Sequence, residues 1–370
     1  MKICYLADAN SVHTKKWCDF FKNKGYDITV ISLNPGNIDG INIYSLGYNW
    51  NELRHKSEFQ KIGYLLKIGK IKKIIKKIKP DILHAHYASS YGLLGSLLNY
   101  HPFVLSVWGS DIYDFPNKNF LNRAIIKYNL SKADVILSTS KVMADEIRKY
   151  TSKPIQITPF GVDVNFFKPE TPKKIKNKIT IGTIKTLEKK YGIDYLIKAF
   201  AIVDKRLNRE IEMELIIGGQ GSQLGYLIEL TKELGIEQKV TFTGFLSGKE
   251  LVETYNKFDI AVFPSIFDSE SFGVAAVEAQ ACGIPVIVSN VGGLPEATQP
   301  GKSSLVVEKE NVEQLADAIE KLVKNKELRE EMGRAGREYV INNYSINDNL
   351  GKVDEIYQNL YYYKNGRKNL

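Results

Sequence analysis

Cysteine is scarce in this sequence, and the few cysteines follow no pattern. The 370 residues include three, Cys4, Cys18 and Cys282, which are far apart and lie in apolar contexts. An odd number without regular spacing argues against a disulfide framework or a zinc site and indicates a reducing compartment. Paired carboxylates or His/Cys clusters with the spacing of metal ligands are also missing, so we expect no metal ion.

Long apolar segments are missing as well. No run of eighteen apolar residues occurs, so we expect no membrane-spanning helix. The start, MKICYLADAN, leads directly into a strand-like run and lacks the apolar stretch of a signal peptide. These absences predict a cytoplasmic protein, either free or peripheral on the cytoplasmic face of a membrane.

Positive charge is in surplus, with a net charge of +9. Such a surplus is typical of proteins that bind nucleic acid, anionic lipid or a phosphorylated ligand. Lysine, isoleucine and asparagine are frequent along the whole chain, so compositional drift in an A·T-rich genome explains the surplus equally well. We expect no nucleic-acid partner, because no recognition motif or clustered aromatic and basic face is present.

Short β-rich runs alternate with helical patterns, which predicts an α/β fold of two doubly wound domains. We expect domains at 1–165 and 179–346, joined by a linker at 166–178 that contains proline and lysine. A final helix at 347–363, within the segment 347–370, can pack on either domain, and we assign it to the first. The expected strands are 3–7, 28–33, 82–86, 103–107, 135–138, 155–158, 179–184, 213–217, 240–242, 260–263, 286–289 and 305–307.

The stretch from Phe263 to Val286 carries the most chemical information. A strand is expected to end at its start, a loop holds Glu270, and a helix begins near Phe272 and Gly273 with Glu278 inside it. A helix N-terminus binds anions such as a diphosphate, and carboxylates bind ribose and sugar hydroxyls. Taken alone, two glutamates at this spacing are equally consistent with a solvated Glu270 and a packing Glu278.

This stretch, with its pattern PS…E.FG…EA.A.G.PV, resembles the signature of glycosyltransferase family 4. The resemblance implies the GT-B fold, in which two Rossmann-like domains face each other across a cleft. It also implies a retaining transferase whose second domain binds a nucleotide sugar. Glu270 would then bind the donor sugar and Glu278 the ribose, with Ser271, Phe272 and Gly273 at the phosphates.

Other segments match the same family in order. Residues 182–192 resemble its phosphate-binding loop, in which Lys190 matches the family lysine and Lys185 stands where arginine is usual. The resemblance assigns both lysines to the diphosphate; the alternative, in a lysine-rich chain, is that they are ordinary surface residues. Gly219 lies in a G.G loop, and Thr243 lies in a segment whose backbone meets the nucleobase in this family.

The first half matches the family more loosely and corresponds to its acceptor side. Ser11 and His13 resemble an S-x-H-T subgroup, and the resemblance places them near the donor phosphates; the alternative is that they only begin a helix. In the segment PDILHAH, alternation puts His84 and His86 on one face of a strand. His84 reads as a packed histidine, and His86 as the candidate that faces the cleft.

Trp108 departs from the family pattern, because it replaces the histidine of the H-G-x-D loop that often contacts the donor sugar. Asp111 still matches this loop, and the resemblance assigns it either to the acceptor or to the orientation of the loop. This departure argues against a catalytic histidine at position 108.

The stretch from Leu65 to Lys79 has apolar residues at helical spacing with lysines opposite. One interpretation is a crossover helix with a solvated face. The other is attraction to an anionic membrane surface, which would suit a lipid-linked acceptor.

Taken together, the sequence predicts a metal-independent, hexosyltransferase-type enzyme that needs no cofactor. A UDP-sugar is the favoured donor, and a glycan or lipid-linked glycan of a surface polysaccharide is the favoured acceptor. The catalytic candidates are Glu270, Lys190, His86 and Asp111. The alternatives are a nucleotide-sugar epimerase on the same scaffold and an inactive scaffold that only binds the donor.

Overall fold

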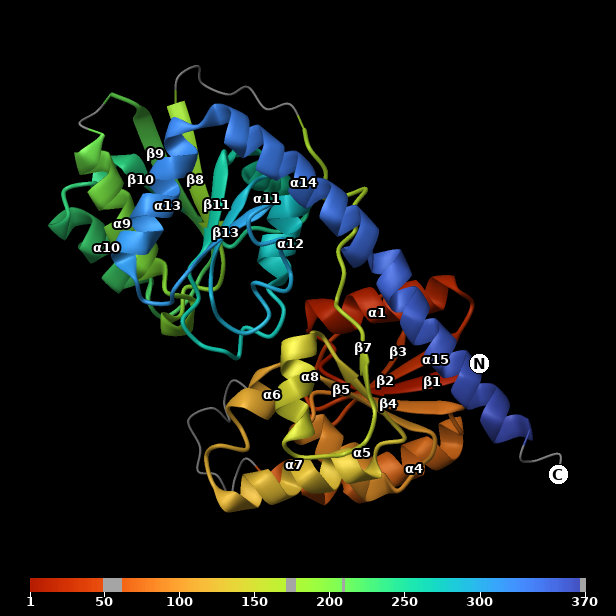
Figure 1. Cartoon of the computed structure of the whole chain (residues 1–370). Helices are drawn as coiled ribbons and strands as arrows, with labels where there is room; N and C mark the ends of the chain where they lie inside the picture. The colour runs from red at the N-terminus through yellow and green to blue at the C-terminus, as the bar shows by residue number, and fades with distance from the viewer. Residues whose placement is uncertain (49–61, 171–177, 208–209, 367–370) are drawn as a thin grey trace. The chain divides into compact units, whose positions relative to one another are not determined.

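The chain divides into two compact units (Figure 1). The computed structural model describes residues 1–48, 62–170, 178–207 and 210–366. The first unit comprises Met1–Phe160 and Asn349–Leu370, and the second comprises Gly161–Asp348. Part of the segment expected as a linker is held by the second unit, since the Asn256 side chain hydrogen-bonds to the backbone of Lys168 and Glu170. Residues 171–177 of that segment lie outside the described residues.

The first unit is built on a parallel sheet. Among the described residues it has seven strands in the order β3-β2-β1-β4-β5-β6-β7. The strands are β1 (Lys2–Leu6), β2 (Asp27–Ser32), β3 (Asn42–Ser45), β4 (Ile82–His86), β5 (Phe103–Val107), β6 (Val135–Ser138) and β7 (Ile155–Ile157). The helices are α1 (Val12–Asn23), η1 (Ile62–Lys67), α4 (Ile68–Ile78), α5 (Ser90–Leu98), α6 (Ser110–Tyr113), α7 (Phe120–Lys132), α8 (Lys141–Arg148) and α15 (Ile346–Gly366).

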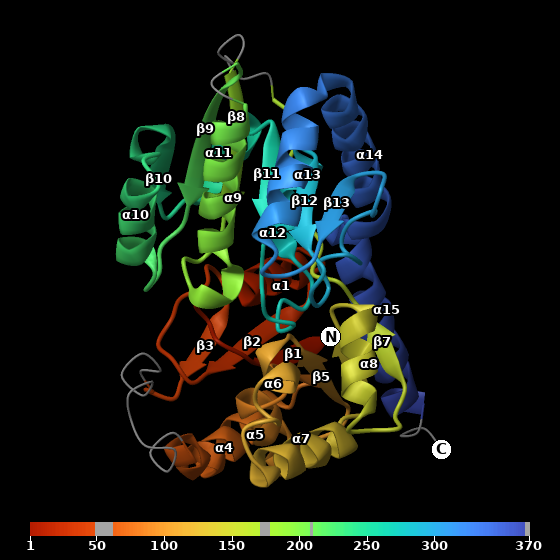
Figure 2. The same ribbon diagram turned by 60° about the vertical axis from the view of Figure 1, so that its left-hand side comes forward.

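Helices cover both faces of this sheet (Figures 1 and 2). Helices α4, α5, α7 and α8 pack on one face, where their apolar residues share a core with Leu83 and Leu105 of the central strands. Helices α1 and α15 pack on the other face, where Tyr5 contacts Trp17 and Tyr357. Strands β4 and β5 are therefore buried along their whole length, as is usual for a parallel sheet between two helical layers.

Helix α15 joins the first unit although it follows the second in sequence. The Tyr357 hydroxyl lies 2.5 Å from His84 Nδ1 of β4. On the same helix, Asp354 accepts hydrogen bonds from Lys24 Nζ at 2.8 Å and from the Tyr26 hydroxyl at 2.6 Å. His84 also lies 2.7 Å from the Ser106 hydroxyl, so it is a packed and fully bonded histidine.

The second unit holds another parallel sheet, with six strands among the described residues in the order β10-β9-β8-β11-β12-β13. The strands are β8 (Lys178–Ile184), β9 (Glu212–Gly218), β10 (Val240–Gly244), β11 (Ile260–Phe263), β12 (Val286–Ser289) and β13 (Ser304–Val307). The helices are η2 (Lys189–Tyr191), α9 (Ile193–Arg206), α10 (Leu224–Glu233), η3 (Glu237–Lys239), α11 (Gly248–Lys257), α12 (Val274–Ala281), α13 (Val312–Lys324) and α14 (Lys326–Tyr344).

Two features differ from the expectations. Strand β3 lies where no strand was expected, because it is a short, partly exposed edge strand without a buried apolar run. In α4, Ile74 is buried beside Ile71 and Ile75. It is absent from the apolar stripe expected at helical spacing, which comprises Leu65, Ile68, Ile71, Ile75 and Ile78. Within the described parts of the chain, none of the helices is long and apolar enough to cross a membrane.

Candidate functional site

In the second sheet, the order in which the chain adds strands reverses at β8. From β8 the chain moves outward to β9 and β10, and it later returns to place β11 on the other side of β8. Loops that follow the two strands at such a switch point diverge and leave a crevice at the carboxyl ends of the strands, where ligands bind in open α/β sheets. Lys185 directly follows β8, and the loop from Pro264 to Gly273 follows β11.

Lys185 and Glu270 meet at this switch point. Lys185 Nζ lies 2.8 Å from Glu270 Oε1, and the two side chains are only 16% and 10% exposed. Burial lowers the pKa of Lys185, but the charges of Glu270, Tyr191 and Glu278 outweigh burial and hold this pKa above its usual value. The lysine is therefore fully charged at neutral pH.

A second cation, Lys190, lies over the same tyrosine ring as Lys185. The Nζ atoms of Lys185 and Lys190 lie 4.6 and 4.7 Å from the centre of the Tyr191 ring. The loop that carries Lys190 is joined to the loop after β11, because the Ile266 N–H donates to the Lys190 carbonyl at 2.9 Å. Gly192 closes this loop at a φ of 62°, where a Cβ would come within 2.1 Å of the Pro264 carbonyl oxygen.

Gly219 directly follows β9 and lies against the backbone of Lys185. The Lys185 N–H donates to the Gly218 carbonyl at 2.9 Å, which ties the ends of β8 and β9 together. At Gly219, φ is 130° and a Cβ would lie 1.9 Å from the Lys185 carbonyl oxygen, so only glycine fits here. Thr243 adjoins the same turn, since a Cβ at Gly218 would lie 3.3 Å from the Thr243 hydroxyl.

Helix α12 begins beside the Glu270 loop. Gly273 caps it at a φ of 86° and supplies no capping side chain, so the first-turn amides depend on other acceptors. Ser271 and Phe272 are buried, and the Phe272 ring packs on Tyr344 with the ring centres 5.1 Å apart. The Phe272 side chain thus belongs to the core.

Glu278 lies within α12 and is half-buried. Its Oε2 accepts a hydrogen bond from the Tyr255 hydroxyl at 3.2 Å. Burial, followed by the charge of Glu278, raises the pKa of Tyr255, so the phenol stays protonated and keeps donating. One oxygen of Glu278 is thereby oriented by the protein.

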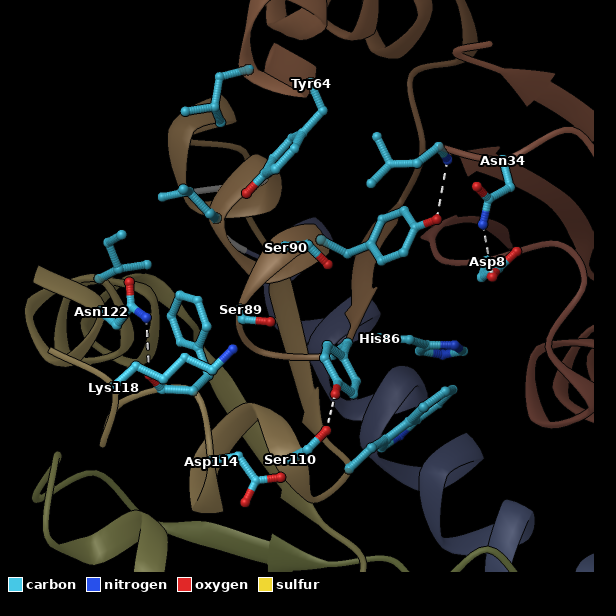
Figure 3. A pocket seen from close by; sticks show the side chains of 18 of the residues that line it. Asp8, Asn34, Tyr64, His86, Ser89, Ser90, Ser110, Asp114, Lys118 and Asn122 are labelled. Carbon is cyan, nitrogen blue, oxygen red and sulfur yellow. Dashed lines mark hydrogen bonds between the residues drawn. The ribbon is translucent and has the colours of Figure 1, made fainter. Parts of the chain in front are cut away.

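The first unit has a pocket at its own switch point, between β1 and β4. Its volume is about 640 Å³, and its lining comes from segments after β1, β2, β4 and β5, from η1 and from the start of α7 (Figure 3). Tyr64, Leu65, Phe115, Leu121 and Ile125 form an apolar part of this lining. Polar side chains also line it, namely Asp8, Asn34, His86, Ser89, Ser90, Ser110, Asp114, Lys118 and Asn122.

His86 lines this pocket and is 1% exposed. Its ring is surrounded by Tyr5, Trp17, His84 and Trp108, with ring centres between 4.6 and 5.0 Å away. Its Nδ1 lies 3.5 Å from the Thr14 hydroxyl, whereas its buried Nε2 has no hydrogen-bond partner among the described residues. Burial, and then the charge of His13, lowers the pKa of His86 to about 3, so the ring is neutral at physiological pH.

This burial predicts an acid-sensitive fold. Because the folded-state pKa lies below the unfolded value of about 6.5, the contribution of His86 to stability is complete above pH 6.5 and is lost as pH falls toward 3. Between pH 7.5 and pH 5, the loss from this one group should be about 2 kcal/mol. Thermal unfolding of wild type and His86→Phe over this range should show a shallower pH dependence for the variant. The same dependence in both proteins would contradict the assignment, and His101→Gln, at an exposed histidine, is the control.

Asp111 and the residues at the start of α1 have partners within the first unit. Asp111 is fully buried and accepts hydrogen bonds from the backbone N–H groups of Ala88 at 2.6 Å and Gly109 at 2.8 Å. Burial raises its pKa to about 6, although these hydrogen bonds lower it in part. Of the two roles expected for Asp111, this geometry supports orientation of the loop. The Ser11 hydroxyl caps α1, and the His13 ring stacks on Phe160 with the ring centres 4.0 Å apart.

Three of the residues at these sites were not expected from the sequence. Tyr191 carries the ring shared by the two lysines, Tyr255 orients Glu278, and the Tyr87 hydroxyl contacts Ser110 in the first-unit pocket. Tyr191 follows Lys190 directly in the loop that resembles a phosphate-binding loop, and this position could have indicated its role. Tyr255 lies 23 residues before its partner, and no local pattern marks it.

Both halves of the chain match known protein families. The family described as "Glycosyl transferase 4-like" matches residues 2–140, and "Glycosyl transferases group 1" matches residues 165–339. A D-inositol 3-phosphate glycosyltransferase of Corynebacterium jeikeium is 33% identical over 282 residues, which are 68% of this chain and 66% of that protein. An N-acetyl-alpha-D-glucosaminyl L-malate synthase of Bacillus anthracis is 26% identical over 316 residues, 81% of each.

A solved structure supports the fold. The Anabaena protein HepE in complex with UDP-glucose has a TM-score of 0.79 at 18% sequence identity, and the match covers 97% of this chain and 100% of that one. The two parallel α/β units are those of the GT-B fold, as the resemblance predicted. The chain belongs to the group 1 glycosyltransferases, that is, to glycosyltransferase family 4.

Proposed function

We propose that this glycosyltransferase transfers a hexose from a nucleotide-diphosphate donor, with a UDP-sugar favoured, and that it retains the anomeric configuration. The observation that carries the proposal is the meeting of Lys185 and Glu270 at the switch point of the second sheet, beside Lys190 and the start of α12. This arrangement combines cations for a diphosphate with a carboxylate for a sugar. The UDP-glucose bound to the related HepE fold supports the choice of donor.

Each group has a role in the proposed reaction. Lys185 and Lys190 neutralise the diphosphate and stabilise the charge that develops on it as the bond from the sugar C1 to the phosphate oxygen breaks. Glu270 holds a sugar hydroxyl, and Glu278, oriented by Tyr255, binds the ribose. The acceptor hydroxyl attacks C1 from the face that the phosphate leaves, and its proton passes to the leaving phosphate oxygen. No protein nucleophile and no metal ion is required by this scheme.

The pocket of the first unit is proposed to bind the acceptor. Its neutral His86, with the unpartnered Nε2, is suited to hydrogen-bond a hydroxyl group, and Asp111 acts by positioning the loop that carries Trp108 and Ser110. We propose a glycan or lipid-linked glycan of a surface polysaccharide as acceptor, on the cytoplasmic side of a membrane. Contact with that membrane through the segment from Leu65 to Lys79 is part of the proposal.

A thermal-shift comparison tests the donor assignment. Wild type and Glu278→Ala are heated with UDP, GDP, ADP and their sugars, with and without a metal chelator. A ligand at a hundredfold its dissociation constant should add about 2.7 kcal/mol of stability. We expect a clear shift for one nucleotide, reduced in Glu278→Ala and unchanged in the control Glu331→Ala, at an exposed glutamate of α14.

Three outcomes would contradict parts of this proposal. A folded protein that no nucleotide stabilises would contradict donor binding altogether. A shift that disappears with the chelator would contradict metal independence. Binding of a UDP-sugar without release of UDP, when glycan and glycolipid acceptors are supplied, would favour an inactive scaffold instead.

A further inference from the structure

One helical layer of the first unit has an outer face of unusual composition. Helix α5 packs between α4 and α7 on the same side of the sheet (Figures 1 and 2). We define the basic–apolar face as the outer side of η1, α4, α5 and α7. No aspartate or glutamate occurs in any of these four elements.

Cations dominate this face. The exposed lysines of α4 are Lys70, Lys72, Lys73, Lys76 and Lys77, and α7 adds Arg123 and Lys127. Among the described residues, the lysines of α4 take part in no ion pair with an acidic side chain. The next helix of the same layer, α8, differs, because its Asp145 and Glu146 pair with Arg148 and Lys149. Within this helical layer, the elements of the basic–apolar face therefore carry cations without acidic residues, whereas α8 carries both.

Large apolar side chains lie exposed among these cations. Leu66 at the end of η1 is 86% exposed, and Phe120 and Leu121 at the start of α7 are 87% and 54% exposed. Water is a poor solvent for such side chains, and adjacent exposed apolar residues within a basic surface are typical of proteins that lie on a bilayer. Two exposed leucines favour an apolar medium over nucleic acid, whose backbone and bases offer little aliphatic contact.

The pocket of the first unit is continuous with this face. Leu65, Lys118 and Leu121 line the pocket, and each of them adjoins or belongs to an element of the basic–apolar face. In Figure 3, Tyr64 and the pair Lys118 and Asn122 lie at the side of the pocket away from Asp8. An acceptor held at a membrane would therefore have a short path from the bilayer surface to the pocket.

We propose that the basic–apolar face docks on a bilayer rich in anionic lipid, with Phe120, Leu121 and Leu66 inserted among the head groups and the lysines of α4 on the lipid phosphates. This inference rests on the proposed function, because it takes the first-unit pocket as the acceptor site. It extends the membrane contact from the single basic helix to a surface of several elements and assigns the apolar anchor to the start of α7.

Vesicle flotation tests the proposal with the full-length protein. Vesicles of phosphatidylcholine alone are compared with vesicles of equal parts phosphatidylcholine and phosphatidylglycerol. Wild type should bind the anionic vesicles at least about tenfold more tightly, since each basic residue near such a surface adds to the attraction. Phe120→Ser/Leu121→Ser and Lys72→Glu/Lys73→Glu/Lys76→Glu should each lower this binding by about tenfold or more.

Matched variants on the second unit serve as controls. Tyr226→Ser/Ile341→Ser removes two exposed apolar side chains, and Lys205→Glu/Lys257→Glu/Lys321→Glu reverses three exposed lysines. The apolar control variant should bind anionic vesicles like wild type. The charge-reversal control should lose markedly less binding than the charge-reversal variant of α4. All variants should keep the wild-type thermal shift with UDP, which separates this inference from the donor assignment.

Two results would overturn the docking surface. The first is equal binding to neutral and anionic vesicles, or an equal loss in the first-unit and second-unit variants. The second is binding of a double-stranded oligonucleotide that depends on the same lysines of α4, together with no binding to vesicles. Either result, together with an intact UDP shift, would reject this docking surface and leave the proposed donor binding and sugar transfer standing.

Discussion

Lys185→Met should lower the free energy of unfolding by about 3 kcal/mol and reduce kcat/KM by about two to three orders of magnitude. The loss of stability arises because the Glu270 carboxylate, 10% exposed, would lose the cation 2.8 Å away. The loss of activity arises because one of the two cations that face the diphosphate is removed. Thermal unfolding measures the first effect, and release of nucleoside diphosphate measures the second.

Two further variants separate these effects. Lys185→Met/Glu270→Gln removes both charges and should recover much of the stability but none of the activity, which a double-mutant cycle would show as coupling. Lys185→Arg restores the residue type usual in this family and should keep both properties. Additive losses of stability in the cycle would mean that the ion pair does not form in solution.

Gly219→Ala is expected to have the second large effect, about 3 kcal/mol of destabilisation with loss of nucleotide binding. The new Cβ would lie 1.9 Å from the Lys185 carbonyl oxygen, which is backbone and cannot rotate away. The carboxyl ends of β8 and β9 would therefore move apart, and Lys185, which follows β8, would be displaced. Thermal unfolding with and without UDP measures both consequences.

Two other glycines provide the controls for this prediction. At Gly235, φ is 66° but a new methyl group would meet no atom within 4 Å, so Gly235→Ala isolates backbone strain of about 1 kcal/mol. Gly225 lies in α10 in open space, and Gly225→Ala should be neutral or slightly stabilising. Equal effects at all three positions would contradict the steric explanation for Gly219.

The fold was largely predictable because its central strands are buried on both faces. Such strands appear in the sequence as short continuous apolar runs, and the expected strands 82–86, 103–107 and 260–263 coincide with β4, β5 and β11. Strand β3 was missed because an edge strand has only one neighbour and needs little apolar surface. The expected helix at 347–363 corresponds to α15, whose ends lie slightly further out.

The candidate site was predictable in its residues but not in its pairings. The sequence indicated Lys185 and Glu270 separately, yet their ion pair joins residues 85 positions apart and depends on the strand order at β8. Burial decided several roles that residue type left open. Asp111 has its oxygens on backbone amides, and Ser11 caps a helix, because a buried carboxylate and a helix start must each satisfy their nearest partners first.

The hydrogen bond between Tyr357 and His84 has a consequence for biosynthesis. His84 is translated early, but its partner on α15 emerges only after Gly161–Asp348 has been made. At typical elongation rates of about 5–20 residues per second, that interval is roughly 10–40 s. During it, the sheet face that α15 covers is exposed on the nascent chain, including Tyr5 and part of the aromatic cluster around His86. A ribosome-bound chaperone therefore has a defined surface and a defined time in which to act.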